Sequence, residues 1–437
     1  MSAPFPVLLE WHLRRYEAFL ASNALITSNP LVAGSSEVSI KERSSAVNLL
    51  ASESMACPEI MAALSAIYYV QSIEGEIDER WSPESDLLDK IESDAVNCAK
   101  DVFGLEYANV QPLSATQANQ AVYLAALQPG IGTILCLGLR EGGHLSHGAL
   151  RETYVRRHHN VEIYGVDSFE RGLCLETVEK RIKETRPTLV VAGGSSYPRE
   201  IPFDGLAKLA HEHGALFLAD TSHTAGLVAA GVHKSVATSD FVTAGLHKTF
   251  CGPRSGIVLS KCQHKTKLAA AVFPGLVSSS LPNTIAAKAV ALRVAQTSEF
   301  KGLQHRIQNN ARAIAEVLSA TGIPLYTGGT DSHLVVLRPD ASIPSADNVR
   351  KLRRIGVLVN ANPVPGDKPG RHNVTGIRLG TVWISQLGFD IHHSAKLAEI
   401  MARALTNHDP EELRRKVNSL LEEVLGGGST HSCMPAK

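Results

Sequence analysis

The chain has 437 residues, of which 44% are hydrophobic and 20% are charged, a composition typical of a globular protein with more than one domain. Lysine plus arginine equals aspartate plus glutamate at 43 each, so charge gives no reason to expect nucleic-acid binding, and no apolar run reaches the roughly 20 residues of a membrane span. The seven cysteines are scattered and form no Cys-x-x-Cys pair, which predicts a reducing, cytoplasmic environment and no metal site.

Residues 1–45 are predicted to form an N-terminal arm or helix that packs on a partner subunit. Apolar residues recur at helical spacing there, while Glu10 and Glu17 argue against a secretory or mitochondrial leader. The next segment, 46–290, alternates short apolar runs with helical segments, and we expect it to form a large domain that binds the ligand.

Six apolar runs of this large domain are predicted strands: 133–139, 161–166, 188–194, 215–220, 241–245 and 256–260. Two predicted helices cover 116–127 and 203–214. Nearly continuous apolar strands separated by helices are typical of a mostly parallel α/β sheet that is covered on both faces.

The pattern changes after residue 290, and a smaller α+β domain is predicted over 291–425. Its expected elements are a helix over 303–322, strands within 332–339 and 376–383, and a helix over 394–405. Residues 426–437 are predicted to be a disordered tail.

Polar residues gather where the predicted strands of the large domain end. Asp220 ends the run "ALFLAD", and Lys248 follows the run "FVTAG". Ligands of open parallel sheets bind at the carboxyl ends of the strands, so we expect both side chains at one edge. A third segment, "NVQPLSATQAN", places Ser114, Ala115 and Thr116 where a loop enters a helix, and free N–H groups at such a position suit a phosphate.

A carboxylate, a lysine and a phosphate cradle together are what pyridoxal phosphate (PLP) requires. The lysine bonds to the cofactor aldehyde, and the carboxylate pairs with the pyridinium nitrogen. His144, in "GGHLSHG", is a candidate to stack on the ring. Each feature alone is more often structural, as a helix cap, a strand-end carboxylate or a loop histidine. The ordered set of three favours a PLP site.

The residues lie in motifs that resemble those of the serine hydroxymethyltransferases, which are fold-type I PLP enzymes. The resemblance runs from residue 48 to residue 389 through "EYANVQPLSATQAN", "GGHLSHG", "VVAGGSSYPREI", "DTSHTAGLVAAGVH", "LHKTFCGPRSG", "AVFPG", "IAAKAVAL", "GGTDSHLVVL" and "TGIRLGT". It implies an α/β, aminotransferase-like fold. It also implies that Lys248 binds the cofactor, that Asp220 pairs with the pyridinium nitrogen and that His144 stacks on the ring.

Further roles follow from the same resemblance. It implies that Ser114, Ala115 and Thr116 hold the phosphate, that Ser195 and His223 lie near the ring oxygen, and that His247 flanks the lysine on its phosphate side. Arg378 is implied to bind the substrate carboxylate, which a guanidinium fork suits. Glu74 is implied as the acid/base, with help from His144 or His223, and Ser52 as a substrate-binding residue.

The chain departs from the family's pattern around the substrate pocket. Ser72 and Ser82 stand where the family has tyrosines that line this pocket, partly across a dimer interface. Ser278 and Ser279 stand where it has two glycines that the neighbouring subunit offers to the phosphate. The folate-site segment is replaced by residues 368–376. These departures argue against tetrahydrofolate as a co-substrate, with neutral drift in a working hydroxymethyltransferase as the alternative.

We therefore expect a PLP-dependent enzyme that acts at Cα of a small amino acid and breaks or forms a C–C bond by aldol-type chemistry. "WSPES" and "PGDKPGRHNVTGIRLG" also resemble threonine transaldolases, so a relative that uses no folate is the first alternative, beside an oxygenase-decarboxylase or a racemase. A non-catalytic scaffold is the last alternative, against which Lys248, Asp220 and Arg378 argue. The family implies a homodimer or a dimer of dimers and a small-molecule substrate.

Overall fold

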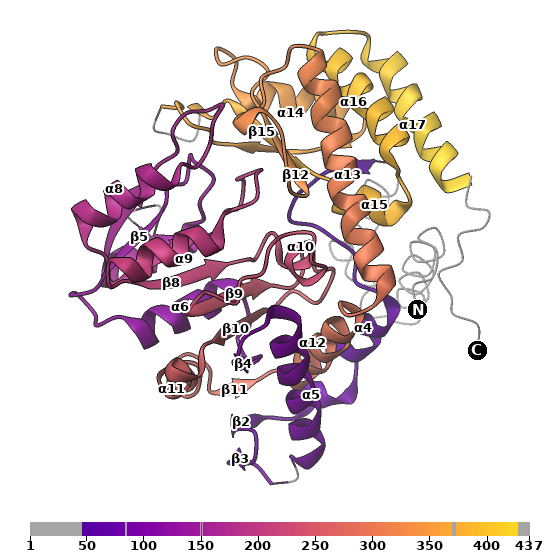
Figure 1. Cartoon of the computed structure of the whole chain (residues 1–437). Helices are drawn as coiled ribbons and strands as arrows, with labels where there is room; N and C mark the ends of the chain where they lie inside the picture. The colour runs from indigo at the N-terminus through magenta and orange to yellow at the C-terminus, as the bar shows by residue number, and fades with distance from the viewer. Residues whose placement is uncertain (1–45, 84, 149, 151, 369–372, 427–437) are drawn as a thin grey trace.

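The computed structural model describes residues 46–83, 85–148, 150, 152–368 and 373–426 (Figure 1). The predicted N-terminal arm and all but the first residue of the predicted tail lie outside this part of the chain. None of the helices in the described ranges combines the length and the apolar composition that a bilayer crossing needs.

A seven-stranded sheet forms the centre of the larger part of the molecule, and the predicted mostly parallel α/β architecture is confirmed. Five strands are parallel, β10 is antiparallel to β9, and β4 is antiparallel to β10. The order across the sheet is β4 (Tyr107–Asn109), β10 (Gly256–Ser260), β9 (Phe241–Gly245), β8 (Leu216–Asp220), β7 (Leu189–Ala192), β5 (Thr133–Leu137) and β6 (Asn160–Tyr164). All six predicted strands are present. Neither β4 nor the direction of β10 was predicted: β4 has only three residues, and an apolar run carries no signal for its direction.

Helices cover both faces of this sheet (Figure 1). Alternate residues of β7 enter two different cores, Val190 and Ala192 on one face and Leu189 and Val191 on the other, as the two-residue period of a strand requires. The first core is closed by α8 (Leu175–Thr185), α9 (Phe203–Glu212) and α10 (Ala225–Ala229), and the second by α6 (Ala115–Ala126), α7 (Tyr154–His158) and α11 (Lys265–Val272).

A small antiparallel sheet lies beside the large one and was not predicted. It has the order β11 (Ser279–Ser280), β2 (Ile73–Glu76), β3 (Glu79–Arg80). Figure 1 shows it at the foot of the molecule, next to α5 (Asp86–Phe103) and below α4 (Pro58–Leu64) and α12 (Pro282–Val294). Its strands have only two to four residues, too few for a periodic pattern in the sequence.

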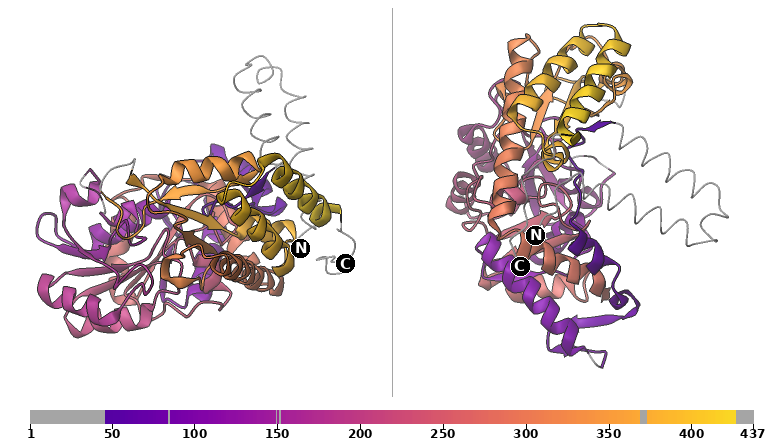
Figure 2. Two further views of the ribbon diagram at one scale, coloured as in Figure 1. Left: turned by 90° about the horizontal axis from the view of Figure 1, so that it is seen from above. Right: turned by 90° about the vertical axis from the view of Figure 1, so that its right-hand side faces the viewer.

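The C-terminal part has its own hydrophobic core and its own sheet, β12–β15–β14. Figures 1 and 2 show this part in orange and yellow. α13 begins at Ser298, five residues before the prediction, because Thr297 caps it by accepting a hydrogen bond from the N–H of Phe300. The short β1 (Val47–Asn48) pairs in parallel with β13 and so brings the start of the described chain to this part. The elements are α13 (Ser298–Ala320), β12 (Leu334–Leu337), α14 (Ser345–Arg354), β13 (Val357–Leu358), β14 (Asn360–Asn362), β15 (Gly376–Gly380), α15 (Val382–Leu387), α16 (Ile391–Leu405) and α17 (Pro410–Gly426).

Candidate active site

The parallel pairing of β8 and β9 brings Asp220 and Lys248 to the same edge of the sheet. Asp220 pairs with Thr243, and Lys248 follows the end of β9 by three residues. The lysine is 8% exposed, and its Nζ has no hydrogen-bond acceptor among the described residues. Burial lowers the pKa of Lys248 from 10.5 to about 8; the charge of Asp220 opposes this shift, and that of Arg378 adds to it. A neutral amine is therefore accessible near neutral pH.

Asp220 is a buried, ionised carboxylate. Its Oδ2 accepts hydrogen bonds from Nε2 of His147 and from Nδ2 of Asn119, both at 2.8 Å, and its Oδ1 accepts from the N–H of Ser222 at 2.9 Å. Burial by itself would raise the pKa of Asp220, but the hydrogen bond and charge of His147 hold that pKa well below its usual value. His147 is fully buried and was missed, although "GGHLSHG" contains a second histidine three residues after His144.

His144 is joined to this carboxylate through a polar chain. Its Nδ1 accepts from the N–H of Ser146 at 3.1 Å and lies 2.7 Å from Oγ of Ser146, which also accepts from Asn119. Burial, followed by the charge of His147, lowers the pKa of His144 to about 4. The imidazole is therefore neutral and held in place, which suits the predicted stacking role.

The predicted phosphate cradle, Ser114–Thr116, lies at the N-terminus of α6. Ser114 caps the helix by accepting from the N–H three residues on, at 3.1 Å, and the N–H groups of Ala115 and Thr116 have no acceptor among the described residues. A Cβ at Gly245 would lie 3.4 Å from Cβ of Ala115 and 3.6 Å from Oγ of Ser222. The carboxyl ends of β8 and β9 therefore lie next to the N-terminus of α6. Ser222, which the sequence analysis missed, has a buried hydroxyl without a partner in the described part of the chain.

His247 and Ser52 lie near the same strand ends. The carbonyl of His247 accepts from Oγ of Ser54 at 2.9 Å, whereas its buried Nδ1 has no partner among the described residues. Burial lowers the pKa of His247 to about 3. Ser52 follows Ala51, and a Cβ at Gly380, two residues after Arg378, would lie 2.5 Å from Cα of Ala51.

The side chain of Arg378 extends from β15 to the loop that follows β7. Its Nη1 donates to the carbonyl of Ser195 at 2.5 Å and its Nε donates to Oδ1 of Asn360 at 3.1 Å. Oγ of Ser195 donates to the carbonyl of Gly143, which precedes His144. Burial lowers the pKa of Arg378 to about 10, so the guanidinium is charged at neutral pH. Nη2 makes no hydrogen bond within the described ranges and is available to a ligand.

His223 is buried against a second histidine that the sequence analysis did not single out. Nδ1 of His223 lies 3.5 Å from Nε2 of His333, and the two rings stack with centroids 5.6 Å apart. Burial lowers the pKa of both rings, that of His333 to about 3. His333 lies in the quoted motif "GGTDSHLVVL", so the signal was present in the sequence without an assigned role.

The remaining predicted residues gather on the small sheet instead. The hydroxyls of Ser72 and Ser279 lie 2.9 Å apart, Oγ of Ser82 donates to the carbonyl of Ser72, and Glu74 pairs with Ser279 across the strands. Ser278 directly precedes Ser279. Within the described residues no hydrogen bond links this group to Lys248, Asp220 or Arg378. Hydrogen bonds among the described residues therefore join only part of the predicted site.

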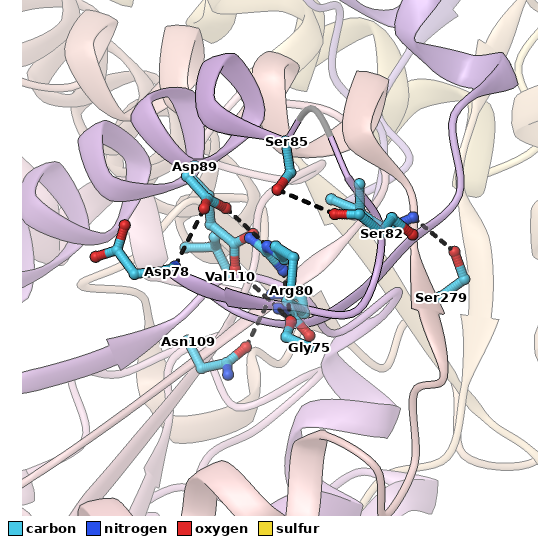
Figure 3. A network of polar contacts seen from close by, with 12 residues as sticks. Gly75, Asp78, Arg80, Ser82, Ser85, Asp89, Asn109, Val110 and Ser279 are labelled. Carbon is cyan, nitrogen blue, oxygen red and sulfur yellow. Dashed lines mark hydrogen bonds and ion pairs between the residues drawn. The ribbon is translucent and has the colours of Figure 1, made fainter.

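Arg80 fixes the β2–β3 hairpin in place (Figure 3). Its side chain is 2% exposed and donates to Oδ1 of Asp89 at 2.7 Å, to Oε2 of Glu92 at 2.5 Å and to the carbonyl of Gly75 at 2.5 Å. Nε2 of Gln111 donates to the same Glu92 and to the same carbonyl. The hairpin that carries Glu74 is thereby tied to α5 and to the segment that precedes the phosphate cradle.

Comparison with known proteins agrees with these motifs. The family model of serine hydroxymethyltransferase matches residues 29–401. The serine hydroxymethyltransferase of Coprothermobacter proteolyticus is 39% identical over 380 residues, which cover 86% of this chain and 91% of that protein. The predicted fold type, the PLP cofactor and the class of PLP-dependent transferase are thus confirmed. The chain belongs to the serine hydroxymethyltransferase family.

Proposed function

We propose that this protein breaks and forms the Cα–Cβ bond of a serine- or threonine-like amino acid, with glycine as the shortened partner. The observation that carries the proposal is the meeting of Lys248, Asp220, Arg378 and His144 around one edge of the sheet. These side chains come from four different segments: the carboxylate of Asp220 is ionised, the guanidinium of Arg378 is charged, the imidazole of His144 is neutral, and the lowered pKa of Lys248 makes its neutral amine accessible. A scaffold without catalysis has no use for a buried amine that lies at the strand ends near Asp220 and Arg378 and has no hydrogen-bond acceptor among the described residues.

The residues present fit PLP. The buried amine of Lys248, the open N–H groups of the phosphate cradle, Oγ of Ser222 and Nδ1 of His247 all lack protein partners in the described part of the chain. Lys248 would hold the aldehyde and Asp220 the pyridinium nitrogen, while His144 would cover one ring face. The phosphate cradle would hold the phosphate with His247 nearby, and Ser195 and His223 would lie near the ring oxygen. When bound, PLP withdraws the electron pair that remains on Cα after a bond breaks.

Arg378 would bind and orient the substrate. Its Nη1 and Nε are held by Ser195 and Asn360, which leaves Nη2 to meet a carboxylate. A carboxylate fixed there sets which bond at Cα faces the withdrawing ring, because rotation about the Cα bond to nitrogen is then restricted. Ser52 would contribute to the same site, because it follows Ala51, whose Cα would lie 2.5 Å from a Cβ at Gly380.

Glu74 would accept the proton of the β-hydroxyl and return it. It lies on the small sheet, so we propose that a second copy of the chain supplies it together with Ser72, Ser82, Ser278 and Ser279. The active protein is then a homodimer or a dimer of dimers. The rigid ties of Arg80 to α5 suit a hairpin that has to present a carboxylate to another subunit.

A mixing experiment tests the shared site. Lys248→Ala and Glu74→Gln are each expected to be inactive as homodimers. When equal amounts are unfolded and refolded together, half of the dimers are mixed, and each mixed dimer has one intact site if Glu74 acts across the interface. We expect about a quarter of the wild-type activity. If Glu74 acts within its own chain, the mixture stays inactive, which contradicts the proposal.

Three serines on and beside the small sheet favour a second candidate, the transfer of the glycine unit to an aldehyde without folate. Ser72, Ser82 and Ser279 bond to one another and leave more room than aromatic side chains would. The test compares serine cleavage with and without tetrahydrofolate, and threonine with and without an added aromatic aldehyde. We expect no acceleration by tetrahydrofolate and a new β-hydroxy amino acid from the aldehyde. Acceleration by tetrahydrofolate would assign the folate-dependent reaction instead.

The cysteines support a reducing location, and we propose the cytoplasm. Within the described residues six cysteines are free thiols, and burial raises the pKa of Cys136 and of Cys251 to about 12. Buried thiols of this kind act as apolar side chains and need no disulfide partner.

A further inference from the structure

Lys288 is a buried lysine on α12 that is not among the residues of the candidate active site. It is 1% exposed, and its Nζ donates to three backbone carbonyls: those of Val110 at 2.5 Å, Pro112 at 2.8 Å and Gly256 at 3.0 Å. No carboxylate of the described residues forms a salt bridge with it. Three donors and three acceptors are thus matched, while the charge itself has no direct counter-ion.

The three carbonyls belong to the loop that precedes the phosphate cradle and to the strand that packs against this loop. Val110 and Pro112 lie just before Ser114, the cap of α6, and Gly256 begins β10. A Cβ at Gly256 would lie 2.3 Å from the carbonyl oxygen of Ser114, and the N–H of Gly256 donates to Pro112 at 3.3 Å. One ammonium group therefore fixes the loop before the helix relative to the strand that packs on it.

The pKa of Lys288 is also shifted by its surroundings. Burial lowers its pKa to about 7, and the charge of Glu92 opposes that shift. Hydrogen bonds to three carbonyl oxygens also stabilise the protonated form. The carboxylate of Glu92 is itself bound by Arg80 and Gln111. A buried cation without a directly bound counter-ion is unfavourable, and a phosphate at the neighbouring cradle would supply the missing negative charge.

We propose that Lys288 is a positioning residue for the phosphate end of the cofactor. It turns three carbonyl groups toward itself and so away from the phosphate, and it adds positive charge behind the N-terminus of α6. It acts through the loop 110–114 and does not touch the reacting atoms. The inference rests on the placement of the phosphate at Ser114–Thr116 in the proposed function.

The test compares two aldehydes, PLP and pyridoxal, which differ only in the phosphate. Dissociation constants are measured by spectral titration of the apoenzyme of the wild type and of Lys288→Met. We expect the constant for PLP to rise about tenfold or more and that for pyridoxal by less than about threefold, since only the phosphate senses the loop and the charge. Lys288→Arg, which keeps the charge and the donors, is expected to retain most of the preference for PLP.

Leu292→Ala is the matched control, because Leu292 is fully buried on the same helix and contacts the hydrophobic core. It should lower the melting temperature and leave the preference for PLP over pyridoxal unchanged. The inference is overturned if Lys288→Met leaves the ratio of the two dissociation constants unchanged, whether both ligands bind as in the wild type or both bind equally more weakly. If that variant does not fold, Lys288→Gln is measured by the same criterion. A wild type that binds pyridoxal as tightly as PLP would instead contradict the placement of the phosphate.

Discussion

His147 and Asp220 form the most important buried pair at the scale of single residues. The histidine is fully buried and its Nε2 lies 2.8 Å from the carboxylate, so it both orients Asp220 and keeps it ionised. An ionised partner is what a pyridinium nitrogen requires. His147 is therefore expected to act through Asp220 and not on the substrate.

His147→Phe should remove this support while it keeps the shape of the side chain. We expect the free energy of unfolding to fall by about 1–3 kcal/mol and kcat to fall more than tenfold, because Asp220 loses a charge-assisted hydrogen bond. Urea denaturation and steady-state kinetics measure the two effects. The control is His211→Phe, since His211 makes a similar contact, 2.7 Å, with Asp240 near the opposite edge of the sheet. An unchanged kcat in His147→Phe would show that Asp220 does not need the histidine.

The lowered pKa of Lys248 predicts how cofactor capture depends on pH. The amine must be neutral to bond to an aldehyde, and its neutral fraction rises as the pH rises through about 8. The rate at which the apoenzyme captures PLP should therefore increase with pH and level off above about 8. Stopped-flow absorbance over a pH series measures this rate. A rate that continues to rise toward 10.5 would mean that the site leaves the pKa of Lys248 unshifted.

At the scale of an element, the guanidinium of Arg80 holds the β2–β3 hairpin in place. Arg80 neutralises Asp89 and Glu92, whose side chains are 12% and 3% exposed, and it also satisfies the carbonyl of Gly75. Strands of four and two residues have too few ladder hydrogen bonds to hold a fixed position alone. The hairpin therefore depends on this side chain for its place next to α5.

Arg80→Met should leave two buried carboxylates without their partner. We expect the free energy of unfolding to fall by about 3 kcal/mol, and activity to fall as well because Glu74 is carried by the same hairpin. Arg293→Met is the control: Arg293 also binds a carboxylate, that of Asp94, but its side chain is 66% exposed, so the unfolding midpoint should not move. Equal stability of the two variants would contradict the role given to Arg80.

At the scale of the whole molecule, exposed apolar side chains lie beside the small sheet that contains the β2–β3 hairpin. Trp81 is 72% exposed, Val70 60% and Leu281 46%, and all three lie within three residues of a strand of the small sheet. Trp81 also packs edge-to-face on Phe273, with ring centroids 5.4 Å apart. Such a cluster is typical of a surface that another subunit covers.

Trp81→Glu should weaken the proposed dimer. A charge in the middle of an apolar contact is unfavourable, so we expect the molar mass from light scattering to shift toward the monomer at low protein concentration, with a parallel loss of activity. Ile131→Glu is the matched control, because Ile131 is 73% exposed but lies in a turn before β5. A full-size dimer with Trp81→Glu would place the interface elsewhere.

The sequence by itself determined the large sheet and the cofactor, and it predicted most of the residues that are proposed to surround the cofactor. Apolar runs of five to seven residues encode buried strands directly. Asp220 ends one such run and Lys248 follows another, so both were expected at the same sheet edge. Only the tertiary structure decided the contact of Arg378 with Ser195, 183 residues away, and the contacts of His147, His333 and Lys288. It also placed Glu74 and the serines on the small sheet, with no hydrogen bond to Lys248 among the described residues. These features depend on which side chains meet across the fold, and no local pattern encodes such a meeting.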